Sequence, residues 1–321
     1  MTARILWLLA LLFFVPGVWA ACSVATTSGA FGSVSSFMLN STEQTTSANV
    51  LVQCDVVLGL LNNDTVTLTY TGASVSAGTR AALKRTDNTS ITDTIPVRLC
   101  GQVGCANNSE IAINGSYTWN GSTLLSLLGS RRFTLPLWFR TTSGLNVSAG
   151  PYQVTFNFSV YYNICQVGLL GICGTAQTGT AATTLQLTLT VANDCIAITA
   201  PDVNFGSAPL VKNFPVISQS VAVTCTKGSV YSVGINNGAY ANGNSRNMAS
   251  GSNRLNYEIY KGATNNRWGS SGSERWASEA SSAISADGLL RTYNYNAKIL
   301  TNQPTPPAGV YSDTVVVDIT F

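Results

Sequence analysis

Histidine is absent from this chain of 321 residues, and charged residues make up only 10% of it. Without histidine there is no His-based catalytic triad and no His-based acid–base step. The few carboxylates of the first half form no pair whose spacing suggests glycoside hydrolysis. The net charge of +3 is spread without a basic run, which argues against a nucleic-acid partner. We therefore expect neither an enzyme nor a bound cofactor.

Long apolar runs are also missing beyond the N-terminus. Residues 1–20 predict a secretory signal peptide, since Arg4 precedes an apolar run from Ile5 to Val15 and Ala20 precedes the cleavage point. No later segment reaches the roughly 18 apolar residues of a membrane helix, so no integral membrane segment is expected in the exported chain. A lipid-modified Cys22 is the alternative, although Trp19 stands where such a signal has an aliphatic residue.

Eight cysteines behind an export signal predict four disulfides in an oxidising compartment. Spacing alone leaves their connectivity open. A zinc site is the competing interpretation, and the missing histidines count against it. Two similar openings and two short loops suggest the pairs Cys22 with Cys54, Cys195 with Cys225, Cys100 with Cys105, and Cys165 with Cys173.

The chain contains two copies of one β-rich pattern, at about 21–191 and 192–321. Cys22 is followed by Phe31-Gly32, and Cys195 is followed at nearly the same distance by Phe205-Gly206. Each copy closes with an Ala-Gly-x-Tyr turn and an alternating strand, at 149–160 and at 308–321. Short strands separated by Gly and Asn turns predict an all-β chain with two tandem immunoglobulin-like β-sandwiches.

The two copies differ at their ends. Copy one continues into residues 184–191, which alternate polar and apolar and predict its own closing strand, with Leu185, Leu187, Leu189 and Val191 inward. Copy two has no such segment, so the second sandwich is expected to lack its final strand and to need a partner chain. The expected groove has Ile196 and Ile198 on one lip and Val315, Val317, Ile319 and Phe321 on the other.

The Cys…Phe-Gly…Cys opening and the ending Ala308–Val317 resemble the spore coat protein U domain, the pilin domain of archaic, Csu-type chaperone–usher pili. The tandem arrangement resembles the tip adhesin of such pili. This resemblance implies that a periplasmic chaperone first covers the groove of copy two. At an outer-membrane usher the next pilus subunit then replaces the chaperone by donor-strand complementation. Only Ala21 would precede Cys22 after cleavage, so a subunit that accepts but cannot donate a strand is expected at the pilus tip on the cell surface.

Copy one also carries three apolar segments, at 56–61, 124–128 and 167–172, that interrupt the alternation of a sandwich core. Exposed aliphatic clusters mark binding sites. The resemblance implies finger-like loops that attach cells to apolar surfaces, abiotic or host, and promote biofilm formation. The alternatives are core segments, such as a buried helix at 122–128, a glycan-binding tip lectin, and a shaft or adaptor pilin without an adhesive role. The expected finger residues are Val57, Leu58, Leu60, Leu61, Leu124, Leu125, Leu127, Leu128, Val167, Leu169, Leu170 and Ile172.

Overall fold

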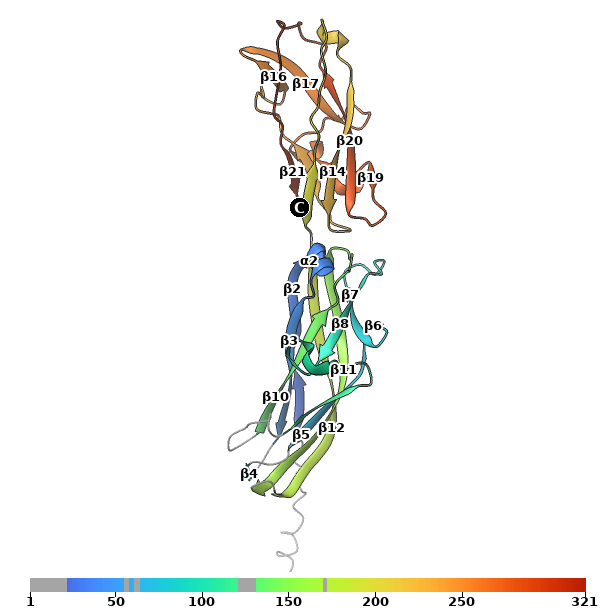
Figure 1. Cartoon of the computed structure of the whole chain (residues 1–321), viewed down its shortest axis with the longest axis vertical. Coiled ribbons are helices and arrows are strands. Elements are labelled where there is room, and N and C mark those ends of the chain that lie inside the picture. Colours follow the sequence, from blue (N-terminus) through green and yellow to red (C-terminus); the bar gives the residue numbers. More distant parts are fainter. Residues whose placement is uncertain (1–21, 55–57, 61–63, 121–130, 170–171) are drawn as a thin grey trace, which may run out of the picture.

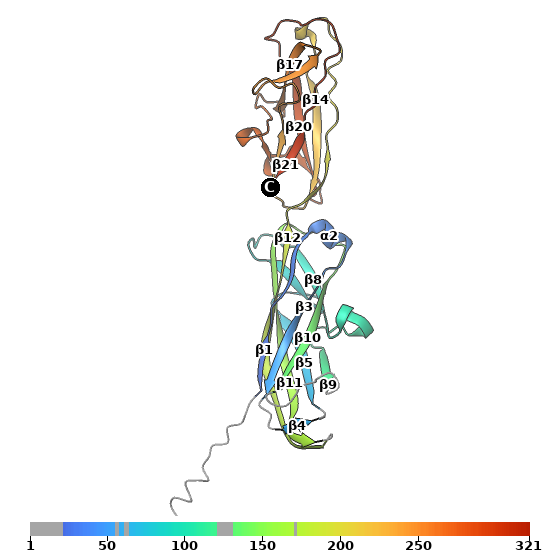
Figure 2. The same ribbon diagram turned by 90° about the vertical axis from the view of Figure 1, so that its left-hand side faces the viewer.

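The computed structural model describes residues 22–54, 58–60, 64–120, 131–169 and 172–321. This part of the chain is all-β and forms two domains that lie end to end (Figures 1 and 2). No helix among these residues is long and apolar enough to cross a membrane. The signal peptide expected at 1–20 lies outside the described residues.

The first domain contains the elements up to residue 192, and its described strands belong to one twelve-stranded sheet around one core. The elements are β1 (Ser23–Thr26), β2 (Gly29–Ser35), α2 (Ser36–Ser41), β3 (Thr45–Cys54), β4 (Leu58–Leu60), β5 (Thr65–Ala73), β6 (Ser76–Ala77), β7 (Arg80–Arg85), β8 (Thr94–Cys100), η2 (Val103–Asn108), β9 (Ser116–Asn120), β10 (Arg131–Thr141), β11 (Gly150–Leu169) and β12 (Ile172–Ala192).

Alternation of apolar and polar side chains explains the first core. Every second residue of β11, from Tyr152 to Ile164, is buried, and every second residue of β10 from Phe133 to Phe139 is buried as well. Leu185, Leu187, Leu189 and Val191 of β12 are buried between the same layers. The four aliphatic residues of segment 184–191 therefore face the core, as the sequence predicts.

Strand β12 closes the first domain by pairing on both of its edges. It runs antiparallel to β11 along the whole length of β11, and it runs parallel to β2 at Leu187–Ala192. It is longer than the expected segment 184–191, because it begins at Ile172 and forms a long hairpin with β11.

The second domain is smaller and has its own core of buried residues between Phe205 and Ile299. Its strands form a six-stranded and a three-stranded sheet within the described residues. The elements are β13 (Cys195–Thr199), η3 (Val211–Asn213), β14 (Ile217–Cys225), β15 (Ser232–Ile235), β16 (Arg246–Ser250), β17 (Asn253–Lys261), η4 (Gly272–Glu274), β18 (Trp276–Ala277), η5 (Ser278–Ala280), β19 (Ala283–Ile284), β20 (Leu290–Ile299) and β21 (Val317–Thr320).

The two domains are joined by a short connection and by contacts around it. Only two residues separate β12 from β13. The amide of Ala149 donates to the carbonyl of Lys227 at 2.9 Å, and the buried hydroxyl of Ser36 donates to that of Thr226 at 3.1 Å. The two domains therefore contact each other through hydrogen bonds at the junction.

Four disulfides link the pairs Cys22–Cys54, Cys100–Cys105, Cys165–Cys173 and Cys195–Cys225. These are the pairs that the repeat and the short loops suggest. Since all eight cysteines are bonded, none is left as a thiolate ligand for zinc.

Candidate functional site

Two of the three apolar segments meet at the end of the first domain that lies away from the second domain. The hairpin of β11 and β12 turns at this distal end, and β4 pairs in parallel with β11, Leu58–Leu60 against Val167–Leu169 (Figure 1). The Cys165–Cys173 disulfide crosses the hairpin next to its turn. Residues 58–60 and 167–169 of the expected finger loops therefore lie in paired strands, and this pairing satisfies their backbone polar groups.

The third segment is flanked by residues that lie at the same end. Asn120 at the end of β9 pairs with Thr65 at the start of β5, and Arg131 at the start of β10 pairs with Cys54 at the end of β3. Cys54 and Thr65 in turn flank the first apolar segment. Strand registers thus bring the flanks of the two segments together beside the hairpin.

The structure describes only part of the expected fingers. Ile172 has a side chain that is 77% exposed, at the turn of the hairpin. The backbone of Leu58, Leu60, Val167 and Leu169 lies in paired strands. The remaining finger residues lie outside the described residues: Val57, Leu61, Leu124, Leu125, Leu127, Leu128 and Leu170.

Asp64 ties the distal end together. Its carboxylate is buried and accepts a hydrogen bond from the amide of Cys165 at 2.8 Å. The bond connects the residue before β5 to the disulfide-linked end of β11. The sequence analysis did not single out this aspartate, since an Asn-Asn-Asp run reads as a simple turn.

The sheet face next to the distal end is uncharged. The hydroxyls of Thr67 and Thr118 are 2.8 Å apart, as are those of Thr69 and Ser116, and Tyr161 is 43% exposed among them. Strand pairing joins β9, β5, β11 and β12 side by side in this order. The outward positions that define this hydroxyl face are 65, 67, 69, 116, 118, 120, 157, 159, 161, 163, 178, 180, 182 and 184.

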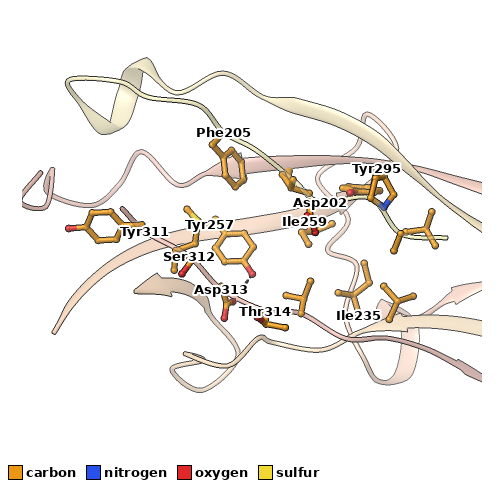
Figure 3. A pocket seen from close by; sticks show the side chains of 18 residues that line it. Asp202, Phe205, Ile235, Tyr257, Ile259, Tyr295, Tyr311, Ser312, Asp313 and Thr314 are labelled. Atoms are coloured by element: carbon orange, nitrogen blue, oxygen red, sulfur yellow. Dashed lines mark hydrogen bonds between the residues drawn. The ribbon is translucent and has the colours of Figure 1, made fainter. Parts of the chain in front are cut away.

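The second domain contains a groove with an apolar floor. A cavity of about 430 Å³ lies between the segment that follows β13 and the segment that precedes β21 (Figure 3). Its floor includes Val221, Ile235, Ile259 and Ala297 from the strands of the core. A second cavity of about 350 Å³ shares Phe205 and Tyr311 with it and extends the groove.

This groove occupies the place that β12 fills in the first domain. There, β12 lies between β2, which contains Phe31-Gly32, and β11, which follows the turn Ala149-Gly150. In the second domain the corresponding Phe205 and the segment after Ala308-Gly309 line the groove. The described residues supply no strand between them. The groove therefore has an apolar floor that no strand of the described residues covers.

The residues expected on the groove lips fall into two groups. Val315 and Val317 line the groove, and Ile319 packs against the core. Phe321 is exposed, with its ring centroid 6.3 Å from that of Tyr231. Ile196 and Ile198 are exposed on β13 and do not belong to the lining of the cavity, which begins at Ala200.

The lip that carries Asp313 is held by a neighbouring loop. The side-chain oxygen of Asn236 accepts from the amide of Val316 at 2.9 Å, and the carbonyl of Asn236 accepts from buried Arg246 at 2.8 Å. Arg246 also pairs with Glu258, whose other oxygen accepts from Arg267 at 2.7 Å. The sequence analysis missed this charge network because its members carry no shared pattern.

Trp268 and Trp276 belong to the core. Trp268 is fully buried and donates from its indole nitrogen to the carbonyl of Val233 at 2.9 Å, and Trp276 is buried beside it. They are therefore packing residues and offer no exposed ring to a sugar.

Comparison with known proteins places the chain among pilus subunits. No curated protein sequence matches it. Over 94% of this chain and 100% of the other, it is similar to the CsuE tip subunit in the chaperone complex CsuC–CsuE from archaic chaperone-usher Csu pili of Acinetobacter baumannii, with 26% identity and a TM-score of 0.52. It is more distantly similar to the CupB6 tip adhesin of Pseudomonas aeruginosa, with 12% identity and a TM-score of 0.36 over 94% of this chain and 93% of that one.

Both domains contribute to the match with a known family. The Spore Coat Protein U domain matches residues 9–158 and 181–318. The first match ends within β11 and the second begins within β12, so the two matches correspond to the two sandwiches. These matches cover most of both copies, and the chain therefore belongs to the Spore Coat Protein U domain family.

Proposed function

We propose that this protein is the tip subunit of a chaperone–usher pilus, and that it attaches cells to apolar surfaces. The observation that carries the proposal is the groove of the second domain at the place of β12. A sandwich with such a groove leaves unpaired strand edges and an apolar floor exposed until another chain supplies a strand. The similarity to a tip subunit solved with its chaperone supports the same assignment.

In this proposal the groove is filled twice. A periplasmic chaperone first covers it, and the next pilus subunit then replaces the chaperone at an outer-membrane usher. The first domain needs no such partner, because β12 already fills the corresponding place between β11 and β2. The protein accordingly sits at the end of the fibre with its first domain outermost, and it is exported to the cell surface.

The distal end of the first domain is the proposed attachment site. Ile172 is exposed there, and the flanks of all three apolar segments converge on it. Burial of one Leu or Ile side chain contributes roughly 1.5–3 kcal/mol, against an ordering cost of about 0.5–1.5 kcal/mol per side chain. A few such contacts give useful attachment, and many pili on one cell multiply it. Attachment of this kind promotes biofilm formation.

The proposal is tested by adhesion of piliated cells to polystyrene. Cells carry Leu60→Asp, Leu128→Asp and Leu169→Asp together, and their fibres are counted by electron microscopy. We expect normal fibres and lost adhesion. Normal fibres with normal adhesion would refute the apolar attachment site and leave a glycan site or a purely structural pilin. Loss of the fibres would mean that these leucines belong to the core.

The hydroxyl face supports a second candidate function, the binding of an uncharged glycan. Threonine and asparagine side chains both donate and accept hydrogen bonds, and an exposed tyrosine ring stacks on a sugar ring. This candidate predicts that the protein sediments with an insoluble neutral polysaccharide and that Tyr161→Ala prevents it. Sedimentation that is unaffected by Tyr161→Ala, or absent, would exclude this face.

A further inference from the structure

Asp313 stands in the groove at a position that is aliphatic in the first domain. It follows Ala308 by five residues, and Val154 follows Ala149 by five residues in the matching turn and strand. Val154 is fully buried and pairs with Leu187 of β12. The corresponding position of the second domain thus presents a carboxylate to whatever strand lies in the groove.

This carboxylate is held in place by its neighbours. One oxygen accepts from the hydroxyl of Tyr257 at 2.7 Å, and the other accepts from the amide of Ala239 at 2.8 Å. It also packs against Gly238, which has a φ of +82° and no room for a Cβ beside the carboxylate. Burial and the bond to Asp313 raise the pKa of Tyr257, so its hydroxyl remains a donor. Two of the roughly four lone-pair sites of a carboxylate are used.

A second carboxylate faces the groove from the other lip. Asp202 lies in the segment that follows β13, and Asp313 lies in the segment that precedes β21 (Figure 3). Neither Lys nor Arg is among the described residues that line the cavity. The ion pairs found among the described residues of the second domain include neither Asp202 nor Asp313. The groove is therefore apolar on its floor and negative on both lips.

We propose that the strand accepted by this groove carries a basic side chain at the position opposite Asp313, the position that Leu187 has in β12. This inference rests on the proposed function, because it names the chemistry of the segment that the next subunit donates. A strand that covers Asp313 removes water from a charged group, and that loss is offset by a charge-assisted hydrogen bond from Lys or Arg. Opposite charges also select the right donor against other apolar strands.

The test uses three synthetic peptides and the full chain without its signal peptide. One peptide has the sequence of residues 183–192, and the other two are its Leu187→Lys and Leu187→Glu forms. Each is labelled at one end, and binding is measured by fluorescence anisotropy at low and high salt. We expect the Lys form to bind at least about tenfold more tightly than the Glu form, with a smaller difference at high salt.

Two variants of the protein locate the effect. Asp313→Asn keeps an acceptor for Ala239 and is expected to remove most of the preference for Lys over Glu. Asp202→Asn, at an exposed residue, is expected to leave folding unchanged and to reduce the preference only in part. Equal binding of the Lys and Glu forms to the unchanged protein would overturn this inference and leave the acceptor groove standing. Binding of none of the three peptides would instead refute the acceptor groove itself.

Discussion

Lys227 Nζ lies 2.8 Å from Asp93 Oδ1, and this ion pair joins the two domains. The other carboxylate oxygen of Asp93 accepts from both the amide and the hydroxyl of Ser148, at 2.9 and 2.6 Å. Ser148 precedes Ala149, whose amide bonds to the carbonyl of Lys227. The carboxylate of Asp93 therefore contacts both domains at the junction. The domains lie end to end, and this contact is specific.

Replacement of Asp93 by Asn is expected to loosen this junction without unfolding either domain. The ion pair is lost while an acceptor for Ser148 remains, so the cost is about 1 kcal/mol. Exchange of the Ala149 amide is expected to become several-fold faster in hydrogen-exchange mass spectrometry. Asp87→Asn, at an exposed carboxylate of the same domain, is the control and is expected to leave this amide unchanged. Unchanged exchange in the Asp93 variant would mean that the ion pair does not hold the junction.

The same carboxylate predicts a dependence on pH. Burial raises the pKa of Asp93, but the donors Lys227 and Ser148 outweigh it and the pKa is lowered. A lowered pKa contributes stability above the unfolded value of about 3.9, and this contribution is lost as the pH falls through the folded value. Small-angle scattering is expected to show an unchanged end-to-end arrangement of the two domains from neutral pH to about pH 4. Below about pH 4 the arrangement is expected to become more flexible. An arrangement that becomes flexible already near pH 6 would contradict this assignment.

Leu187→Ala tests whether β12 closes the first domain. Leu187 is fully buried and pairs with Val154 and Gly29. Removal of its side chain leaves a cavity, and we expect the free energy of unfolding of the first domain to fall by about 2–5 kcal/mol in urea. Gln186→Ala, on the exposed side of the same strand, is expected to change it by less than about 0.5 kcal/mol. Equal effects of both substitutions would argue against a buried closing strand.

The part of β12 that the sequence predicted is the part with an aliphatic inward face. From Gly174 to Thr184 the strand contains only Gly, Ala, Thr and Gln, which give no apolar alternation. The structure explains the small residues, because the ring of Tyr162 on β11 packs over Gly179, where a Cβ would collide with its hydroxyl. An aromatic ring from the neighbouring strand supplies the apolar layer here, so the pattern of β12 alone does not reveal it.

The sequence predicted the position of the groove but only part of its chemistry. The internal repeat predicted where the groove lies, because Phe205 and the Ala308-Gly309 turn each have a counterpart around β12. The alternation predicted an inward side for Val315, Val317 and Ile319, which pack against the core, and also for Phe321, which is exposed. Asp313 and the Arg246 network escaped prediction, since a hydrogen-bonded polar group in a lip depends on loops that are distant in sequence.

Ile172→Ser tests the exposed apolar side chain at the distal end. Its side chain is free of the core, so folding is expected to be unchanged while adhesion of purified protein to polystyrene falls several-fold. Val103→Ser is the matched control, because Val103 is also exposed but lies in η2 on the flank of the domain. Equal losses for both variants would indicate unspecific adsorption and not a distal attachment site.

Arg246→Lys tests whether the buried charge network supports the groove lip. The guanidinium of Arg246 is fully buried and donates to the carbonyls of Asn236, Ile235 and Trp268 as well as to Glu258. Lysine offers one compact ammonium and cannot reach all four acceptors, so buried carbonyls and a carboxylate lose partners.

The expected result for this variant is a second domain destabilised by about 3 kcal/mol, with weaker binding of strand peptides because Asn236 no longer fixes Val316. Thermal unfolding and fluorescence anisotropy measure the two effects. Arg254→Lys, at an exposed arginine of β17 that donates to local carbonyls, is the control and is expected to change neither. If Arg246→Lys lowers stability but leaves peptide affinity intact, the network holds the core and has no part in shaping the lip.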